Sequence, residues 1–421
     1  MATAPFNHGV RVLRLGEDAR PIAVSDVSTV GAVITAPDAD ASVFPPDEPV
    51  QIYTHETEKI ASLGATGTAL DVINAVKAQG IEASIVMVRV EEGADTAATQ
   101  AAMVGSAASQ TGVHALEYAL GHVGLEPDLL IAPGYAAGRV DNAKNPVADA
   151  LEQTAKKLQA VAILDTGGPD KETSLAYRAD FSDRFAYLVD PMVRMLPTGA
   201  TEIAVKPASP YAAGLFVKRD KEKGGPYWSP SNQECGGILG IARPVSYFDG
   251  EIDHEANYLN ENGIATFIPA QVVQGAGGTY SANGRILWGN RTTSDDPLWV
   301  FVNVVRTRAT IEKTIMRSFR WANDQNLSPQ LVISIMRSLQ QFLDELKAVG
   351  AILGGDVYWD RDVNTNASLR LGQLRIEFDA EEAPPLEDLT FGSRRNEVYF
   401  DVLADEINRR INVSFDRTSG V

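Results

Sequence analysis

Cysteine is almost absent from this sequence of 421 residues, in which Cys235 is the single one. One cysteine excludes an intramolecular disulfide and a cysteine-based metal cluster. The residue lies in the apolar, glycine-rich run CGGILGIA, which favours a buried and inert thiol over a reactive one.

Histidine is also too sparse and too scattered for a metal site. The motif H-E-x-x-H does not occur, and no two histidines form a close pair on a helix face. Asp360, Asp362 and Asn364 imitate the start of a calcium loop, but Thr365 stands where the loop needs glycine and Leu371 where it needs glutamate. No metal is therefore expected. The five histidines are His8, His55, His114, His122 and His254.

The motifs of common enzyme classes are missing as well. Neither the dinucleotide-binding spacing G-x-G-x-x-G nor the phosphate loop G-x-x-x-x-G-K-[ST] is present, and no serine stands in G-x-S-x-G. No cofactor is expected, and the sequence offers no catalytic residue to assign.

Long hydrophobic runs are absent too. No apolar run reaches the roughly 18 residues that a membrane-spanning helix needs, and the first residues, MATAPFNHGVRVLRL, do not read as a signal peptide. We therefore expect a soluble chain, without membrane insertion, that stays in the cytoplasm or in a particle assembled there.

Negative charge dominates the sequence. The formal net charge is −18, so the chain should repel nucleic acid unless basic residues are segregated on one surface. Residues 1–150 hold 8 Lys and Arg against 19 Asp and Glu, whereas residues 303–347 hold 7 against 4. This basic stretch is either a solvated helix face or a surface that meets an acidic partner.

The clearest fold signal lies in residues 128–190, where the apolar runs DLLIAP, VAILD and FAYLVD alternate with two helical patterns. Strand, helix, strand, helix, strand with short connections predicts a right-handed parallel sheet. Asn145 and Pro146 are suited to cap and begin the first of these helices. The crevice at the carboxyl ends of the strands is where an α/β hydrolase or a nucleotide-binding enzyme would place its ligand, and this is the alternative function.

The segment from Asn283 to Ser318 is the one around which the rest of the chain is interpreted. It predicts a strand over Arg285–Trp288, a polar turn, a second strand over Leu298–Val305 and then a basic helix. The run from Ile203 through the GGPYWSPSNQECGG segment, rich in Pro, Gly and charge, predicts a long loop.

The most regular helical pattern follows Ser328 and Pro329, with apolar residues at steps of four, four, three, four and three up to Val349, and Gly350 ends it. Alternation then predicts a half-buried strand over Leu369–Asp379 and another over Asn396–Leu403.

Nine segments in order resemble contractile phage tail sheath proteins over nearly the full length of the chain. They are FNHGVRV, APDAD, LGATGTALDVI, VMVRVEEGAD, KPASPYAAG, WSPSN, WGNRT, FVNVVRTRATIEKTI and GAILGGDV. Each is weak alone, and together at these spacings they are specific.

The resemblance implies a multidomain α/β plus α+β chain. Its parts are an N-terminal arm (1–22), a central α/β region (23–250) with a parallel sheet around 84–190, an inner C-terminal α+β domain (251–385) and a C-terminal strand and arm (386–421). The central part is likened to subtilisin in fold, but no Asp, His, Ser set in the required motifs is visible, so the chain is expected not to be an enzyme.

The implied function is that of a structural subunit of a contractile tail sheath, which polymerises as a helical sleeve around a tail tube and contracts from a metastable state. Its expected partners are further copies of itself, the tail tube protein, and baseplate and tail terminator proteins, in the tail of a virion or a phage-like particle assembled in a bacterial cytoplasm.

Two groups of residues are candidates for these contacts. The basic helices are hypothesised to face an acidic tube, and the terminal segments to add strands to neighbouring subunits. The tube-contact candidates are Arg308, Lys313, Arg317, Arg320, Arg337 and Lys347. The candidates for the inter-subunit arms are Val10, Val12, Leu13, Leu15, Val398, Phe400, Val402, Ile411, Val413 and Phe415.

Overall fold

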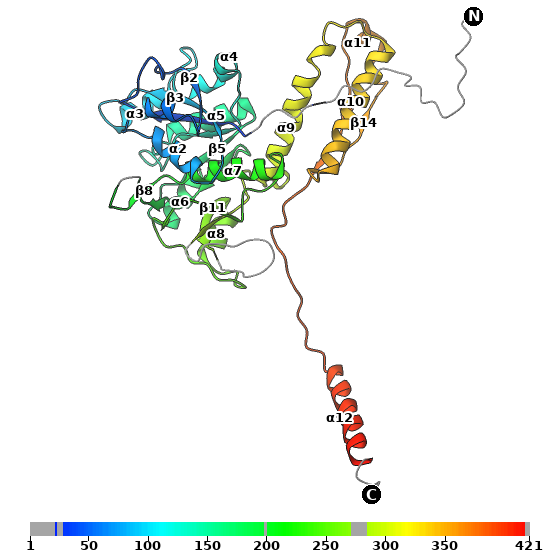
Figure 1. Ribbon diagram of the computed structural model, residues 1–421. Coiled ribbons are helices and arrows are strands. Elements are labelled where there is room, and N and C mark those ends of the chain that lie inside the picture. Colours follow the sequence, from blue (N-terminus) through cyan, green and yellow to red (C-terminus); the bar gives the residue numbers. More distant parts are fainter. Residues whose placement is uncertain (1–21, 23–27, 198–199, 271–283, 417–421) are drawn as a thin grey trace, which may run out of the picture. The chain divides into compact units, whose positions relative to one another are not determined.

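The computed structural model describes residue 22 and residues 28–197, 200–270 and 284–416 (Figure 1). The chain divides into two compact units, one ending at Pro385 and the other beginning at Leu386. Each unit is described by itself below.

A nine-stranded sheet forms the centre of the first unit. The strand order is β2-β3-β1-β4-β5-β6-β11-β12-β9. The six strands from β3 to β11 run parallel, and β2, β12 and β9 pair antiparallel at the two edges. The strands are β1 (Val30–Thr35), β2 (Pro49–Tyr53), β3 (Ser84–Val90), β4 (Leu129–Ile131), β5 (Val161–Asp165), β6 (Ala186–Val189), β9 (Gln233–Glu234), β11 (Ile264–Pro269) and β12 (Arg285–Trp288).

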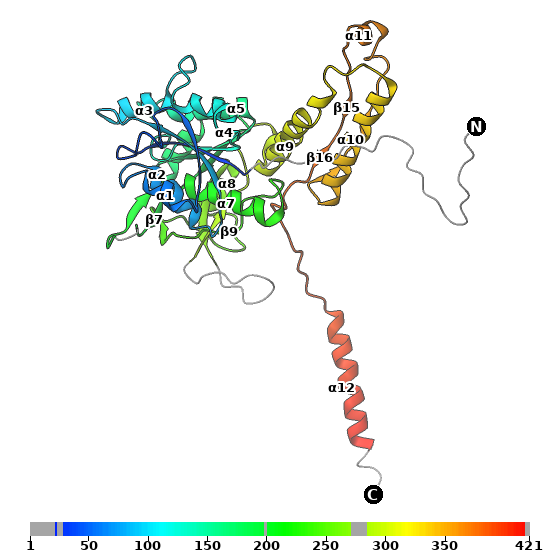
Figure 2. The same ribbon diagram turned by 45° about the horizontal axis from the view of Figure 1, so that its top comes forward.

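Helices cover both faces of this sheet, which is why its middle strands are almost wholly apolar. On one face, α2 and α7 contribute to a core with residues such as Ile34 and Tyr187; on the other, α3, α5 and the 3₁₀ segment η1 pack on residues such as Val33 and Leu164. Figure 2 shows α3 and α5 on one side of the strands and α1, α2 and α7 on the other. The helices are α1 (Thr57–Ala61), α2 (Ala69–Lys77), α3 (Thr96–Val104), η1 (Gly112–Tyr118), α4 (Ala119–Val123), α5 (Pro146–Leu158), α6 (Lys171–Arg178), α7 (Ser209–Lys223) and α8 (Glu255–Glu261).

A small sheet of order β10-β7-β8 stands beside the main one. It is antiparallel and consists of β7 (Val193–Met195), β8 (Ala204–Lys206) and β10 (Gly240–Ile241). Its exposed side chains include Val205, which is 54 % exposed.

The last part of the first unit is built on two helices with their own core. Ile311 of α9 (Val302–Ser318) packs with Leu339, Phe342 and Leu343 of α10 (Pro329–Ala348), and the two helices lie side by side in Figures 1 and 2. Short strand pairs close this core. The remaining elements here are η2 (Pro297–Trp299), η3 (Arg320–Ala322), β13 (Ile352–Gly354) with β16 (Glu381–Glu382), β14 (Val357–Tyr358) with β15 (Glu377–Phe378), and α11 (Asn366–Arg370).

The second unit contains one helix, α12 (Val398–Asp416), within its described residues. Asn396 accepts a hydrogen bond from the amide of Val398 at 3.1 Å, so an asparagine lies at the start of the helix as expected for a cap.

The parallel α/β arrangement predicted from residues 128–190 is confirmed, together with its details. The side chain of Asn145 accepts from the amides of Val147 and Ala148, and Pro146 begins α5. Ser328 likewise accepts from the amide of Leu331 and Pro329 begins α10.

The prediction of a strand over Leu298–Val305 is wrong, because α9 already begins at Val302. Residues 302–307 are all buried. Because all of these residues are buried, no exposed polar face marks the period of the helix, and its β-branched valines read as a strand.

Of the two strands predicted near the C-terminus, the first is confirmed only in part and the second is wrong. Within Leu369–Asp379 only Glu377 and Phe378 pair in a sheet, since Thr365 caps α11 and Gly372, at φ +74°, follows its end. Asn396–Leu403 and the segment RINVSF lie in α12. The predicted C-terminal strand of the 386–421 arm is therefore a helix in the described residues.

Two further interpretations are corrected. The run predicted as a long loop from Ile203 contains α7, fifteen residues long. The strand Arg285–Trp288, which the predicted range 251–385 assigns to the inner C-terminal domain, pairs with β11 and is part of the main sheet. The remaining ranges predicted for the domains stay predictions.

Candidate assembly surfaces

Helix α9 carries three of the six predicted tube contacts, and each of the three is engaged within the chain. Lys313 Nζ lies 2.7 Å from Asp128 Oδ1 and 3.0 Å from Glu126 Oε1. Arg317 lies 3.1 Å from the second oxygen of Glu126, and Arg308 lies 2.6 Å from a carboxylate oxygen of Glu382.

The Lys313 site is buried. The lysine side chain is 5 % exposed, and Asp128 directly precedes β4 of the main sheet. Burial raises the pKa of Asp128, and the charge of Lys313 opposes that rise. A buried ion pair repays its loss of hydration only through such close contacts, so Lys313 holds α9 against the sheet and presents no charge to a second protein.

A second buried ion pair lies on the same helix. The guanidinium of Arg306 donates two hydrogen bonds to Asp220 of α7, at 2.9 and 2.5 Å, in the bidentate geometry that makes such pairs strong. Asn303 adds hydrogen bonds to the backbone oxygens of Tyr227 and Ala383. Helix α9 is thereby fixed to the α/β part and to the C-terminal strands together.

The other three tube-contact candidates lie at the surface. Arg320 in η3 and Arg337 and Lys347 on α10 are exposed. They are the candidate cations whose charge a partner protein can meet.

Two carboxylates at the carboxyl ends of the parallel strands are bound by donors of the chain itself. Asp165, at the end of β5, accepts hydrogen bonds from the amides of Ala208 and Ser209 at 2.6 and 2.9 Å and from the hydroxyl of Ser209 at 2.5 Å. Its carboxylate thus caps the first turn of α7. Burial raises the pKa of Asp165 to about 6, against the effect of these hydrogen bonds.

Asp190, just after β6, is engaged in the same way. It accepts from Ser174 at 2.7 Å and from Thr166, and it forms an ion pair with Arg243. Burial raises its pKa, while these donors oppose the rise. Neither carboxylate is free to act on a substrate, so this crevice does not support the alternative enzyme.

The titratable groups of the described residues form no catalytic or metal constellation. Within the described ranges no group of three His, Cys, Asp or Glu side chains could hold a metal ion. His254 caps α8 by accepting from the amide of Asn257, and His114 pairs with Glu117. Cys235 is buried, as predicted, and burial raises its pKa. No helix among the described residues is long and apolar enough to cross a bilayer.

The candidates for the inter-subunit arms form an N-terminal group and a C-terminal group. Val10, Val12, Leu13 and Leu15 lie outside the described residues. At the other end, four candidates on α12 are strongly exposed: Val398 57 %, Phe400 64 %, Val402 61 % and Ile411 47 %. Val413 and Phe415 fall in the last turns of the same helix.

One side of α12 carries a continuous apolar stripe. Phe400, Leu403, Ile407 and Ile411 follow one another at steps of three, four and four residues, which places them on one face, and each is 47 to 64 % exposed. We call this face the α12 stripe. It has the size and pattern of a helix face that packs against another surface.

The partners of Arg306 and Lys313 were not predicted. Polar residues inside the apolar run VNVVRTRATIEK were the available signal, since a charged residue is rarely buried unless it is paired. The sequence gives no indication that the partners are Asp220 and Asp128, because they lie 86 and 185 positions away.

Comparison with known proteins gives consistent matches along the chain. The family described as "Phage tail sheath protein central domain" matches residues 108–274, and "Phage tail sheath C-terminal domain" matches residues 294–394. A prophage major tail sheath protein of Pseudomonas aeruginosa is 34 % identical over 92 % of this chain and 95 % of its own length. The tail sheath protein of Escherichia phage P2 is 31 % identical over 96 % of this chain and 99 % of its own length.

Solved structures show the same fold at lower identity. The contracted helical sheath of the anti-feeding prophage has a TM-score of 0.65 at 18 % identity and covers 92 % of this chain and 99 % of that one. The contracted PVC sheath of an extracellular contractile injection system has a TM-score of 0.64 at 17 % identity, with 94 % and 99 % covered.

The buried lysine of α9 gives a first prediction. Lys313→Met should lower the free energy of unfolding by about 3 to 5 kcal/mol, because it leaves Asp128 buried without its cation. Lys347→Met, at an exposed site on α10, should change it by no more than about 0.5 kcal/mol. Urea unfolding of both variants makes the comparison, and an Asp128→Leu change added to Lys313→Met should recover part of the loss. Equal stability of the two single variants contradicts the assigned role.

Asp165 gives a prediction about pH. Because the folded state binds this proton with a pKa of about 6 and the unfolded chain with one near 3.8, lowering the pH from 7 to 5 favours folding. This group should add on the order of 1 kcal/mol to the free energy of unfolding over that interval.

Asp165→Asn imitates the protonated carboxyl and should lose this contribution. Urea unfolding of both proteins at pH 5 and pH 7 measures it as the difference between their pH dependences, which cancels the other carboxylates. An equal pH dependence in the two proteins contradicts the raised pKa.

Proposed function

The chain belongs to the phage tail sheath family and is a structural subunit of a contractile sheath, not an enzyme, and we propose that it polymerises with itself into a helical sleeve around a tail tube. The observation that carries this proposal is similarity to sheath proteins over more than nine-tenths of the chain, joined to an exposed apolar helix outside the first compact unit.

The α12 stripe is the proposed polymer contact at the C-terminal end. A 19-residue helix alone is marginally stable in water, and burial of its apolar face against another surface is what stabilises it. We place that surface on a neighbouring copy, so that the helix docks in a groove instead of adding a strand to a sheet. Strand addition stays the proposal for Val10, Val12, Leu13 and Leu15.

Such a contact is head-to-tail, since α12 of one copy meets a different surface of the next. Head-to-tail contacts that do not close into a ring produce an open helix, which is the geometry of a sleeve. Contraction then requires two packings of the same subunits, with the extended one higher in free energy by a few kcal/mol per subunit.

The proposed tube contacts are reduced to Arg320, Arg337 and Lys347, which are exposed. Arg308, Lys313 and Arg317 are held in ion pairs within the chain. Exposed ion pairs contribute about 0.2 to 1 kcal/mol each, which suits contacts with an acidic tube that hold during assembly and separate on contraction.

The remaining partners follow from the same architecture. A sleeve needs a baseplate at one end and a terminator at the other, and we propose both as partners, with assembly in a bacterial cytoplasm. One similar solved structure is the baseplate of the anti-feeding prophage, at a TM-score of 0.65 and 16 % identity. The relatives include phage and prophage proteins, and the particle is accordingly a phage tail or a phage-like injection machine.

The polymer is tested by negative-stain electron microscopy of the purified chain. The parent should form hollow striated cylinders, whereas Ile407→Glu should give particles of monomer size by sedimentation, because it places a charge in the α12 stripe. Val402, an arm candidate that lies outside the α12 stripe, is left out of the proposed contact, so Val402→Glu should leave the cylinders intact. Small discrete oligomers from the parent chain contradict the proposed function.

The tube contact is tested by charge reversal. A chain carrying Arg320→Glu, Arg337→Glu and Lys347→Glu should form sheaths without tube, or extended tails that contract early, when it is produced with its tube protein. Lys77→Glu, an exposed site on α2, is the control. High salt should weaken parent tails in the same direction, since it screens exposed pairs. Extended tails of normal number and length from the triple variant refute the contact.

A further inference from the structure

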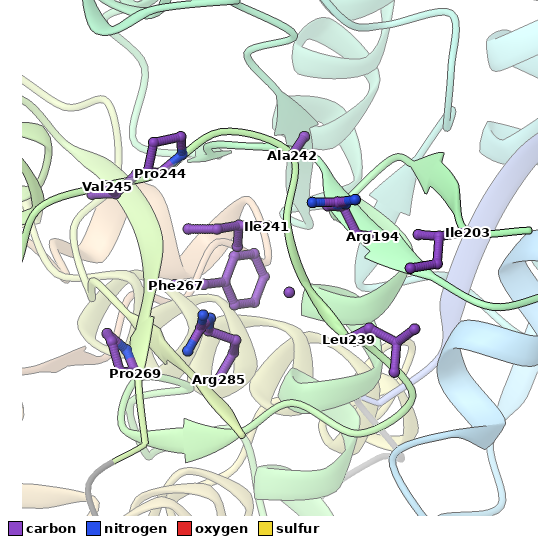
Figure 3. A pocket seen from close by; sticks show the side chains of 11 residues that line it. Arg194, Ile203, Leu239, Ile241, Ala242, Pro244, Val245, Phe267, Pro269 and Arg285 are labelled. Atoms are coloured by element: carbon purple, nitrogen blue, oxygen red, sulfur yellow. The ribbon is translucent and has the colours of Figure 1, made fainter. Parts of the chain in front are cut away.

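A groove of about 440 Å³ lies between the small sheet and the end of the main one (Figure 3). Phe267 of β11 and Ile241 of β10 line it, together with Leu239 and Ile203. In Figure 3 the ring of Phe267 lies between the guanidinium groups of Arg194 and Arg285. We call this cavity the β10 groove.

The two arginines give the β10 groove its chemical character. Among the described residues neither arginine has a carboxylate within ion-pair distance; the one side-chain hydrogen bond of Arg285 goes to the backbone oxygen of Gly284, at 3.4 Å. The Nε atom of Arg285 is buried and has no acceptor in the described part of the chain. A buried donor without an acceptor is unfavourable, so an acceptor that reaches Arg285 in the groove is stabilising.

The surface around the opening is apolar. Leu196, Ile203, Val205 and Leu239 are 48 to 58 % exposed and belong to β7, β8, β10 or the residues next to them. Large exposed apolar side chains gathered on one surface mark a protein contact. Exposed apolar side chains beside two arginines, of which Arg194 is exposed and Arg285 half-buried, fit a segment that carries both apolar and acidic residues.

Such a segment is present in the chain itself. Leu386–Phe391, with the sequence LEDLTF, lies outside helices and strands at the start of the second unit. Leu386, Leu389 and Phe391 are 76, 61 and 83 % exposed, and Glu387 and Asp388 stand between them. Extended, the six residues span about 20 Å, which is enough for two apolar side chains to enter a groove while a carboxylate reaches an arginine.

We propose that the β10 groove of one copy binds the Leu386–Phe391 segment of a second copy, with Asp388 meeting Arg194 or Arg285. This contact rests on the proposed polymer and adds to it a second site, on the α/β part of the subunit. Backbone and apolar contacts supply the affinity, and the ion pair fixes the direction and register of the segment.

The test uses two chains that each carry one new cysteine. Leu239→Cys is at the groove and Leu389→Cys is in the segment; the native Cys235 is buried and does not compete. Assembled together and oxidised, the two chains should give a disulfide-linked dimer that neither chain gives alone. A chain with both cysteines that forms the bond within itself shows the segment bound to its own groove, and this overturns the proposal.

Charge exchange tests the ion pair. Arg194→Glu in the groove chain should lower the yield of cross-linked dimer by about tenfold, and Asp388→Arg in the segment chain should restore it. Lys77→Glu, which is exposed on α2 outside the groove, is the matched control and should leave the yield unchanged. A loss with Arg194→Glu that Asp388→Arg does not restore contradicts the pairing.

Gly240 offers a way to fill the groove without disturbing the fold. It lines the groove, its φ is not positive, and a Cβ added there would meet no heavy atom within 4 Å. Gly240→Leu should therefore fold with the stability of the parent and lose the cross-link.

Electron microscopy of the same samples separates this contact from the polymer. Cylinders that form without the cross-link, also when the groove is filled, refute the groove contact and leave the proposed function standing. Cross-linked dimers in the absence of any cylinder support the groove contact and refute the sleeve.

Discussion

The structure depends on the two buried ion pairs of α9. Lys313 binds the helix to Asp128, the residue before β4, and Arg306 binds it to Asp220 of α7. Each pair brings charges out of water, a cost that only short, well-directed contacts offset. Other packing of α9 against the sheet would leave these charges unpaired, so the pairs select one arrangement of α9 on the α/β part.

Pairing of charged side chains within the chain also explains why the crevice of the parallel sheet does not support an enzyme. The carboxyl ends of parallel strands collect polar groups, and in many α/β proteins these groups meet a substrate. Here Asp165 caps α7, and Asp190 is enclosed by Thr166, Ser174 and Arg243. The acidic side chains are used to hold the chain's own connections, so the fold is retained while the chemistry is absent.

The two proposed contacts share a physical feature. In each, side chains that are not fully packed or paired within one copy meet a surface of another copy. The apolar side chains of the α12 stripe are exposed, and in the β10 groove the buried Nε atom of Arg285 has no acceptor among the described residues. A head-to-tail polymer satisfies both kinds of group at every subunit. It can also change its packing while the subunits keep their internal ion pairs, because the contacts between copies are separate from those pairs.

The family, the parallel α/β arrangement and the caps at Asn145 and Ser328 could be predicted from the sequence, because they depend on residues close together or on motifs in a fixed order. It failed where burial hides periodicity, as in α9, and where apolar alternation is shared by strand and helix, as in α12. The partners of Lys313 and Arg306, and therefore which basic residues remain at the surface, could not be predicted before the fold was known. Ion pairs across 86 and 185 positions leave no local pattern, since their geometry exists only once the sheet, α7 and α9 have packed together.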